Sequence, residues 1–171
     1  MSYLLDANTL IEAKNRYYRM SICPGYWTCL EASSLMGDVA SVASVATEIR
    51  RGKDELADWV EANADLFLPE SDAATQGAFG EVAGYVAGLA DGMKPGAMDE
   101  FLSGADPWLI AKARVTGYTI VTHEQRNPNI RRKFTIPNIC DHFEIQCIDT
   151  FDLLHRLDVR FVLAAREQPA A

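Results

Sequence analysis

Short apolar runs of the kind that form β-strands alternate with longer helical segments along this chain of 171 residues. The runs cover residues 3–5, 38–42, 118–122 and 144–148. Strands that alternate with helices become parallel neighbours, so this order predicts an α/β fold with a mainly parallel sheet. We expect a three-layer α/β/α sandwich of four or five strands. It would form one domain over residues 1–160, followed by a flexible tail over residues 161–171.

Helices are predicted between the runs, where capping residues, glycine and proline mark their ends. The expected ranges are 8–19, 26–35, 44–51, 54–67, 71–89, 106–116 and 150–157, with one helical turn at 136–142. Asn8 and Asp106 are the expected N-caps of the first and sixth of these helices. The segment 71–89 holds four interior glycines, each costing ~1 kcal/mol against alanine, so we expect that small-residue face to pack on the core.

Bulk properties exclude some classes of protein. The net charge of −8 argues against a broad, non-specific nucleic-acid binder, whose footprint is usually basic, but not against a nucleic-acid enzyme. Four cysteines without a CxxC pair favour buried thiols over disulfides, and over a zinc site as the weaker alternative. No apolar run has the length of a membrane span and no signal peptide is recognisable, so we expect a cytoplasmic protein.

Four acidic residues stand where parallel strands end or helices begin: Asp6, Glu48, Asp106 and Glu124. Loops at the carboxyl ends of parallel strands build the binding site of such folds, so these acids are expected to converge. Convergent carboxylates repel one another unless a proton or a cation lies between them. Oxygen ligands suit Mg²⁺ or Mn²⁺, and the sequence therefore predicts a divalent metal centre.

Each acid also has a structural interpretation. Glu48 would be an ordinary solvated helical residue, and Glu124 a charged loop residue. Asp106 precedes a proline, as a helix cap often does, although capping leaves one carboxylate oxygen for a metal. Asp6 is the strongest single candidate, because Asn8 is available to cap the helix that follows it.

Taken together, the acids and their neighbours resemble the PIN-domain nucleases, which include the VapC-like toxins. The resemblance rests on DANTLI at residues 6–11, Glu48 after the second strand, DPWLIA at 106–111 and THE at 122–124. It is closest to a PIN-like subgroup in which DxNxLI, ADPxLIA and VTHE recur. It implies a parallel sheet flanked by helices, and a metal-dependent endoribonuclease that acts as the toxin of a type II toxin–antitoxin module.

The resemblance also implies roles for individual residues. Asp6 and Asp106 would bind the ion most directly, with Glu48 and Glu124 completing the shell, and Asn8 and Thr122 orienting the ligands. Many such toxins have aspartate or asparagine in place of Glu124, so Asp141 stays open as the fourth acid. The lone His123 is expected to be structural.

Two basic clusters follow two of the acids and favour contact with RNA phosphates. They comprise Arg50, Arg51, Lys53, Arg126, Arg131, Arg132 and Lys133. The implied partners are RNA, a cognate antitoxin and a second copy of the chain in a homodimer. The alternatives are a metal-dependent phosphatase, a single-strand or flap DNA nuclease, and a catalytically silent RNA-binding module.

Overall fold

The computed structural model describes residues 2–162, so residues 163–171 of the tail expected over residues 161–171 lie outside the described part. Five parallel strands form one sheet in the order β3-β2-β1-β4-β5. They are β1 (Tyr3–Leu5), β2 (Val39–Val42), β3 (Phe67–Leu68), β4 (Thr119–Val121) and β5 (Cys147–Ile148). The predicted α/β fold with a parallel sheet is confirmed.

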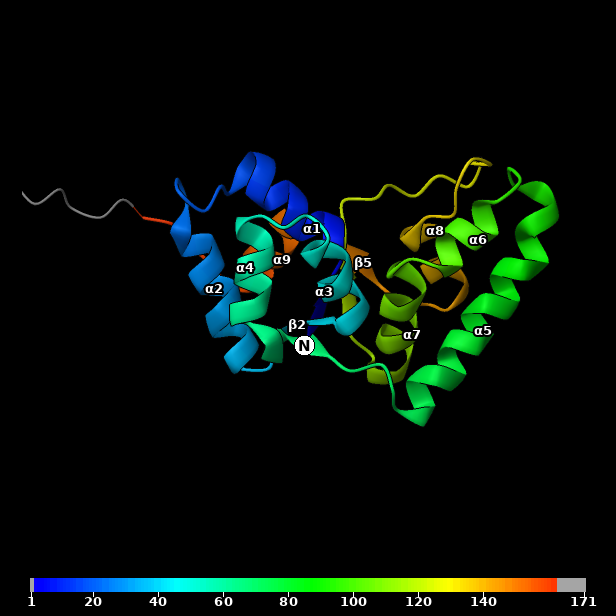
Figure 1. The fold of residues 1–171 in the computed structure, drawn as a ribbon, viewed down its shortest axis with the longest axis horizontal. Helices are drawn as coiled ribbons and strands as arrows, with labels where there is room; N and C mark the ends of the chain where they lie inside the picture. The colour runs from blue at the N-terminus through cyan, green and yellow to red at the C-terminus, as the bar shows by residue number, and fades with distance from the viewer. Residues whose placement is uncertain (1, 163–171) are drawn as a thin grey trace, which may run out of the picture.

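Helices connect the strands and flank the sheet. They are α1 (Ala7–Glu12), α2 (Pro24–Leu35), α3 (Ala43–Arg50), α4 (Glu55–Ala62), α5 (Ala73–Leu89), α6 (Ala97–Leu102), α7 (Asp106–Thr116), α8 (Ile136–His142) and α9 (Thr150–Arg156). Shorter turns are the π-helix η1 (Ala13–Tyr17) and the 3-10 helices η2 (Ala64–Leu66) and η3 (Ala90–Gly92). Figure 1 shows α1, α2, α4 and α9 on one side of the sheet and α5 to α8 on the other.

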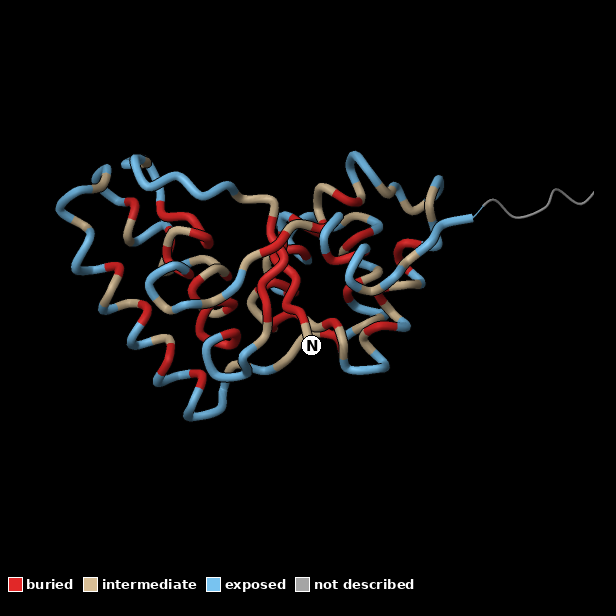
Figure 2. The backbone as a smooth tube through the Cα atoms, turned by 180° about the vertical axis from the view of Figure 1, so that it is seen from behind, coloured by how far each residue is buried: buried red, intermediate tan, exposed pale blue. Residues whose placement is uncertain are grey.

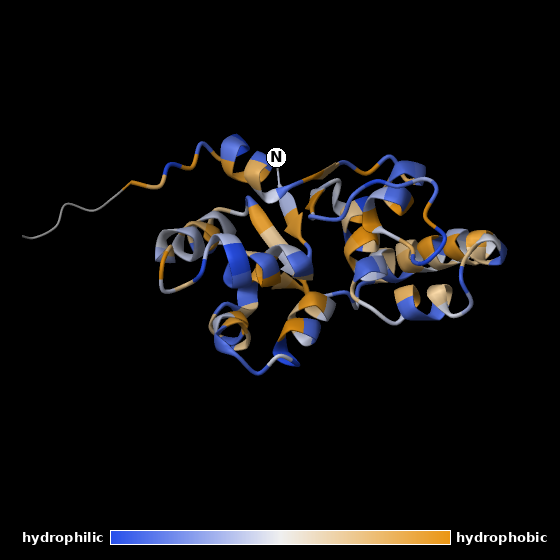
Figure 3. Ribbon diagram, turned by 90° about the horizontal axis from the view of Figure 1, so that it is seen from above, coloured by the Kyte–Doolittle hydropathy of each residue, from blue (hydrophilic) through white to orange (hydrophobic). Residues whose placement is uncertain are grey.

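The hydrophobic core lies on both faces of the sheet. The strand residues Leu4, Leu5 and Ile120 are fully buried, as Figure 2 shows by the red tube at the centre. The strands are correspondingly the hydrophobic centre of the molecule in Figure 3. Within the described residues, no helix combines the length and the apolar character that crossing a membrane requires.

The helices α5 and α7 pack together through polar and aromatic contacts. Asp72 caps α5 by accepting from the backbone N–H of Thr75, and it forms an ion pair of 2.7 Å with Lys112 of α7. The Lys112 side chain is only 8% exposed, so this pair holds a buried charge. The rings of Phe79 and Trp108 stack with their centroids 4.0 Å apart.

Three details differ from the sequence predictions. Phe67, expected in a helical stripe, belongs to β3, a strand of only two residues that the sequence did not predict. Asn8 lies within the first turn of α1, and the N-cap is Asp6, whose side chain makes no capping hydrogen bond. The glycines of α5 do not pack on the core, because a Cβ added at any of them would meet nothing within 4 Å; they are Gly77, Gly80, Gly84 and Gly88.

Candidate metal centre

The sheet reverses its winding between β1 and β4, and this is where a ligand is expected in an open α/β sheet. Asp6 directly follows β1, and its backbone N–H donates to the carbonyl of Val121 in β4. Thr122 and Glu124 follow β4. The topology thus brings two of the four acids to the same edge of the sheet.

Thr122 fixes both of these acids. Its buried hydroxyl donates a hydrogen bond of 2.8 Å to Oδ2 of Asp6. The Thr122 hydroxyl oxygen in turn accepts a hydrogen bond of 3.1 Å from the backbone N–H of Glu124. One side chain therefore sets the position of the Asp6 carboxylate and of the chain at Glu124.

Glu48 comes to the site on α3, which begins directly after β2. The cap residue Val42 has no side-chain acceptor, and Glu70 from the segment before α5 takes that role. Its carboxylate accepts from the backbone N–H of Ser44 at 2.9 Å and from the Ser44 hydroxyl at 2.8 Å. An anion at a helix N-terminus stabilises that end, so Glu70 fixes the helix that carries Glu48.

Asp106 is the first residue of α7 and is not its cap. The capping position belongs to Ala105, and Asp106 makes no side-chain cap hydrogen bond. The expected capping role is therefore wrong. The proline at position 107 starts the helix without a capping side chain, since its fixed φ already suits the first turn.

Three of the four acids line one pocket of about 190 Å³, which we call the carboxylate pocket. Glu48, Asp106 and Glu124 line it together with Asn8 and residues of α6, whereas Asp6 is only 1% exposed and is not part of the lining. The charges of Glu48 and Glu124 act on both aspartates. Glu48 and Glu124 thus lie within electrostatic range of both aspartates, and the two aspartates of each other.

Burial and mutual repulsion make the two aspartates weak acids. Burial, with smaller contributions from the charges of Glu124 and Glu48, raises the pKa of Asp6 to about 7 against the opposing hydrogen bond from Thr122. Burial and the charges of Asp6, Glu124 and Glu48 raise the pKa of Asp106 to about 8. The free site consequently holds protons near neutral pH, and a cation would replace them.

Lys133 supplies a positive charge at the rim. Its ammonium lies 2.5 Å from Oε1 of Glu124, and the other carboxylate oxygen accepts from the backbone N–H of Ile136 at 2.7 Å. The hydrogen bond to Glu124, with the charges of Asp106 and Asp6, raises the pKa of Lys133. Among residues 2–162, no three His, Cys, Asp or Glu side chains form a ready-made metal site, and both oxygens of Glu124 are already engaged.

The alternative fourth acid, Asp141, does not join the others. It lies on α8, outside the lining of the carboxylate pocket, and both its oxygens accept from Arg126 at 2.6 Å. Of the two candidates for the fourth acid, Glu124 lines the carboxylate pocket and Asp141 does not. The imidazole of His123 forms a hydrogen bond of 3.0 Å with the Thr150 hydroxyl, as a structural residue would.

A family model described as "Domain of unknown function (DUF4411)" matches residues 3–161. The chain belongs to the DUF4411 family. No curated protein matches the sequence. The match spans every helix and strand of the described residues, and every residue that lines the carboxylate pocket lies within it.

The basic residues predicted to bind RNA are dispersed in the DUF4411 domain. Arg50 pairs with Glu61, and Arg126 pairs with Asp141. Arg51 lines a smaller pocket of about 130 Å³ that shares Glu48 with the carboxylate pocket. Lys53, Arg131 and Arg132 are exposed. Only Lys133 lines the carboxylate pocket itself.

Sequence reasoning missed several residues of the pocket wall, three of which carry long or charged side chains. Glu100 and Phe101 come from α6, within a segment expected to be mainly a loop, and Phe134 follows Lys133. The acidic pair Asp99-Glu100 in the first turn of α6 was the available signal, since acids favour that end of a helix.

Proposed function

We propose that this DUF4411 domain is a divalent-metal-dependent endoribonuclease of the PIN-like type, which hydrolyses RNA phosphodiester bonds. The observation that supports it is the carboxylate pocket at the switch point of a parallel sheet, where Glu48, Asp106 and Glu124 line the wall and the buried Asp6 interacts electrostatically with all three. The order of these acids along the chain is that of the PIN-domain pattern. Acids with a purely structural role would not be expected to follow that order.

The donor set fits Mg²⁺ or Mn²⁺. All its members are carboxylates, which are hard oxygen ligands, and burial makes their shared negative charge unfavourable without a cation. Asp6 and Asp106 would hold the ion, with Glu48 and, once Lys133 releases it, Glu124. A bound ion supplies a more acidic water and stabilises charge on the phosphate oxygens.

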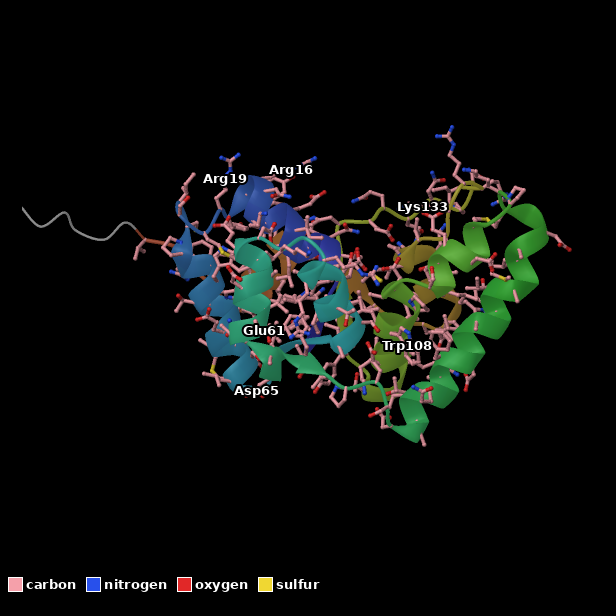
Figure 4. The ribbon with its side chains drawn as sticks, in the orientation of Figure 1. Arg16, Arg19, Glu61, Asp65, Trp108 and Lys133 are labelled. Carbon is pink, nitrogen blue, oxygen red and sulfur yellow. The ribbon has the colours of Figure 1, made fainter. Side chains whose placement is uncertain are left out.

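The chain's own residues contribute orientation and positive charge. Thr122 holds the Asp6 carboxylate, and Lys133 would contact an RNA phosphate when it leaves Glu124. In Figure 4, Arg16 and Arg19 project from the same upper side of the molecule as the loop that carries Lys133. These cations would attract an RNA backbone despite the net charge of −8.

The biological role follows from the resemblance alone. PIN-like toxins imply a cognate antitoxin as partner, a homodimer and a cytoplasmic location, and these stay predictions. A small protein encoded in the neighbouring reading frame, with a DNA-binding half and a flexible segment, would support the toxin assignment.

Cleavage of single-stranded RNA by the full chain tests the proposal. We expect cleavage with Mg²⁺ or Mn²⁺, none with EDTA, and a loss of about 100-fold or more in Asp6→Asn and Asp106→Asn. Asp65→Asn, a change of an exposed acid on η2, is the matched control and should retain activity. Full activity of both site variants would refute the assignment.

The same assay with DNA flaps and a small phosphoester separates the ribonuclease from a DNA nuclease or a phosphatase. A second function, RNA binding without turnover, is favoured by one observation: Lys133 and the N–H of Ile136 engage both oxygens of Glu124. Tight RNA binding, with the RNA left uncleaved in the presence of each divalent metal tested, would support this catalytically silent module.

A further inference from the structure

A second cavity of about 400 Å³ adjoins the carboxylate pocket, and Lys133 and Phe134 line both. It lies between the end of α5, the segment after η3, the loop before α8, and α8 itself. Its volume is that of a small-molecule site, and its wall is largely apolar with a few polar groups. No residue of the predicted acid quartet lines it.

Two aromatic residues, Tyr85 and Phe134, are part of its lining. The ring of Tyr85 stacks on His142 with centroids 3.7 Å apart and planes 3° apart, which fixes its orientation. Phe134 is only 6% exposed and packs against Phe101 at 5.6 Å. A flat, apolar group of a ligand would therefore meet rings that are already positioned.

Hydrogen bonds hold the loop that closes the cavity. The backbone N–H of Lys94 donates to the carbonyl of Arg131 at 2.6 Å. The amide side chain of Asn138 accepts from the backbone N–H of Asn127 at 2.9 Å and donates to its carbonyl at 2.7 Å. The cavity thus has fixed walls on both sides and is not a gap under a free loop.

The charge around the cavity favours an anionic ligand. Arg131 and Lys133 line it. Lys133 pairs with Glu124 and the lining acid Asp141 pairs with Arg126, so Arg131, which bonds only backbone carbonyls, contributes the net positive charge. A ligand with a flat apolar part and a negative charge fits this wall, as a nucleotide does. Single-stranded RNA is recognised in this way, with bases on aromatic rings and phosphates on cations.

We propose that this cavity binds one base of the RNA chain next to the phosphate at the carboxylate pocket. The inference rests on the proposed ribonuclease function and adds a base subsite to it. The common wall of Lys133 and Phe134 makes the two sites adjacent, so one nucleotide step would connect them. The subsite would set which base flanks the cleaved bond.

Nucleotide binding by the full chain in EDTA tests the subsite apart from catalysis. We expect uridine or adenosine 5′-monophosphate to shift the backbone amide signals of Leu89, Gly92 and Asn138, while ribose 5-phosphate leaves them unchanged. Met93→Trp, which fills the cavity, should abolish the shifts. Leu35→Trp, at a site 89% exposed on α2, is the matched control and should keep them.

Cleavage assays complete the test. An RNA with an abasic ribose beside the cleaved bond should raise KM about tenfold for the wild type and have little effect on Met93→Trp. The subsite would be overturned if ribose 5-phosphate shifted the amide signals as much as the nucleotides do. It would also be overturned if the wild type cleaved RNA with the same KM whether or not the abasic ribose is present. Nucleotide shifts in a protein that cleaves no RNA would support the subsite and refute the nuclease.

Discussion

The Thr122 hydroxyl donates to the buried Asp6 carboxylate across 116 positions of sequence, and it joins the ends of β4 and β1 at the candidate metal centre. This hydrogen bond favours the ionised carboxylate, so it lowers the pKa of Asp6 against the effect of burial. The expected function of Thr122 is to keep Asp6 available as a metal ligand near neutral pH.

Thr122→Val removes that hydrogen bond with little change of volume. We expect the pKa of Asp6 to rise, the pH profile of RNA cleavage to move to higher pH, and activity near pH 7 to fall about 10- to 100-fold. Thr122→Ser retains the hydroxyl and should restore the profile. A parallel loss of activity at every pH in both variants would point to damage of the fold instead.

Lys133→Met removes the cation that pairs with Glu124. Because the free acids then lose their internal counter-charge, we expect Mn²⁺ to bind about 3- to 10-fold more tightly, by titration calorimetry. RNA should bind more weakly, because a phosphate contact is lost. Arg132→Met removes the neighbouring exposed cation and should leave the Mn²⁺ affinity unchanged. Weaker Mn²⁺ binding in Lys133→Met would contradict the proposal that the metal ion replaces the Lys133 ammonium beside Glu124.

The stability of the metal-free protein should fall as the pH rises from about 4 to about 8, and level off above that. Both aspartates have a pKa raised from 3.8, so the folded protein holds protons that the unfolded chain has released. Their favourable contribution is complete below the unfolded pKa of 3.8. It is lost at up to roughly 1.4 kcal/mol per pH unit for each group as the pH rises to the folded pKa values, and stability stops falling above them. Urea unfolding in EDTA from about pH 5 to about pH 9 measures this.

The double variant Asp6→Asn/Asp106→Asn is the control for that experiment. Its unfolding free energy should depend less on pH and exceed that of the wild type at high pH, since the buried charges are gone. An identical pH dependence in both proteins would show that the two aspartates do not hold the protons.

The ion pair between Asp72 and Lys112 should matter for folding and not for catalysis. Its hydrogen bonds from Lys112 and Thr75 hold the pKa of Asp72 well below its usual range, so its contribution is present above pH 4 and lost in acid. Asp72→Asn leaves Lys112 buried and unpaired, so we expect a lower Tm than in Lys112→Met. Equal melting temperatures would contradict the importance of the buried charge.

The strand ends were predictable because apolar runs and the acids that follow them are local signals. Asp6 and Glu124 stand beside strands that the sequence marks clearly, and their meeting follows from parallel topology. The strand at Phe67 was not predictable, since two residues carry no periodicity and join the sheet only by pairing with Ser41 and Val42.

Other features depend on contacts that no local pattern encodes. The capping of α3 by Glu70 joins positions 26 apart, and the ion pair of Lys133 with Glu124 depends on the course of one loop. The glycines of α5 were assigned to the wrong face: spacing shows that small residues share a side but not which side is covered. The choice between Glu124 and Asp141 likewise needed coordinates.

Binding of Mn²⁺ tests the central claim most directly, because the account requires Asp6 and Asp106 to share one divalent cation. Electron paramagnetic resonance of the full chain should show stoichiometric Mn²⁺ binding near pH 8, displaced by Mg²⁺, and a large loss of affinity in either Asp6→Asn or Asp106→Asn. Mn²⁺ binding of equal strength in the wild type and in both variants would contradict the account.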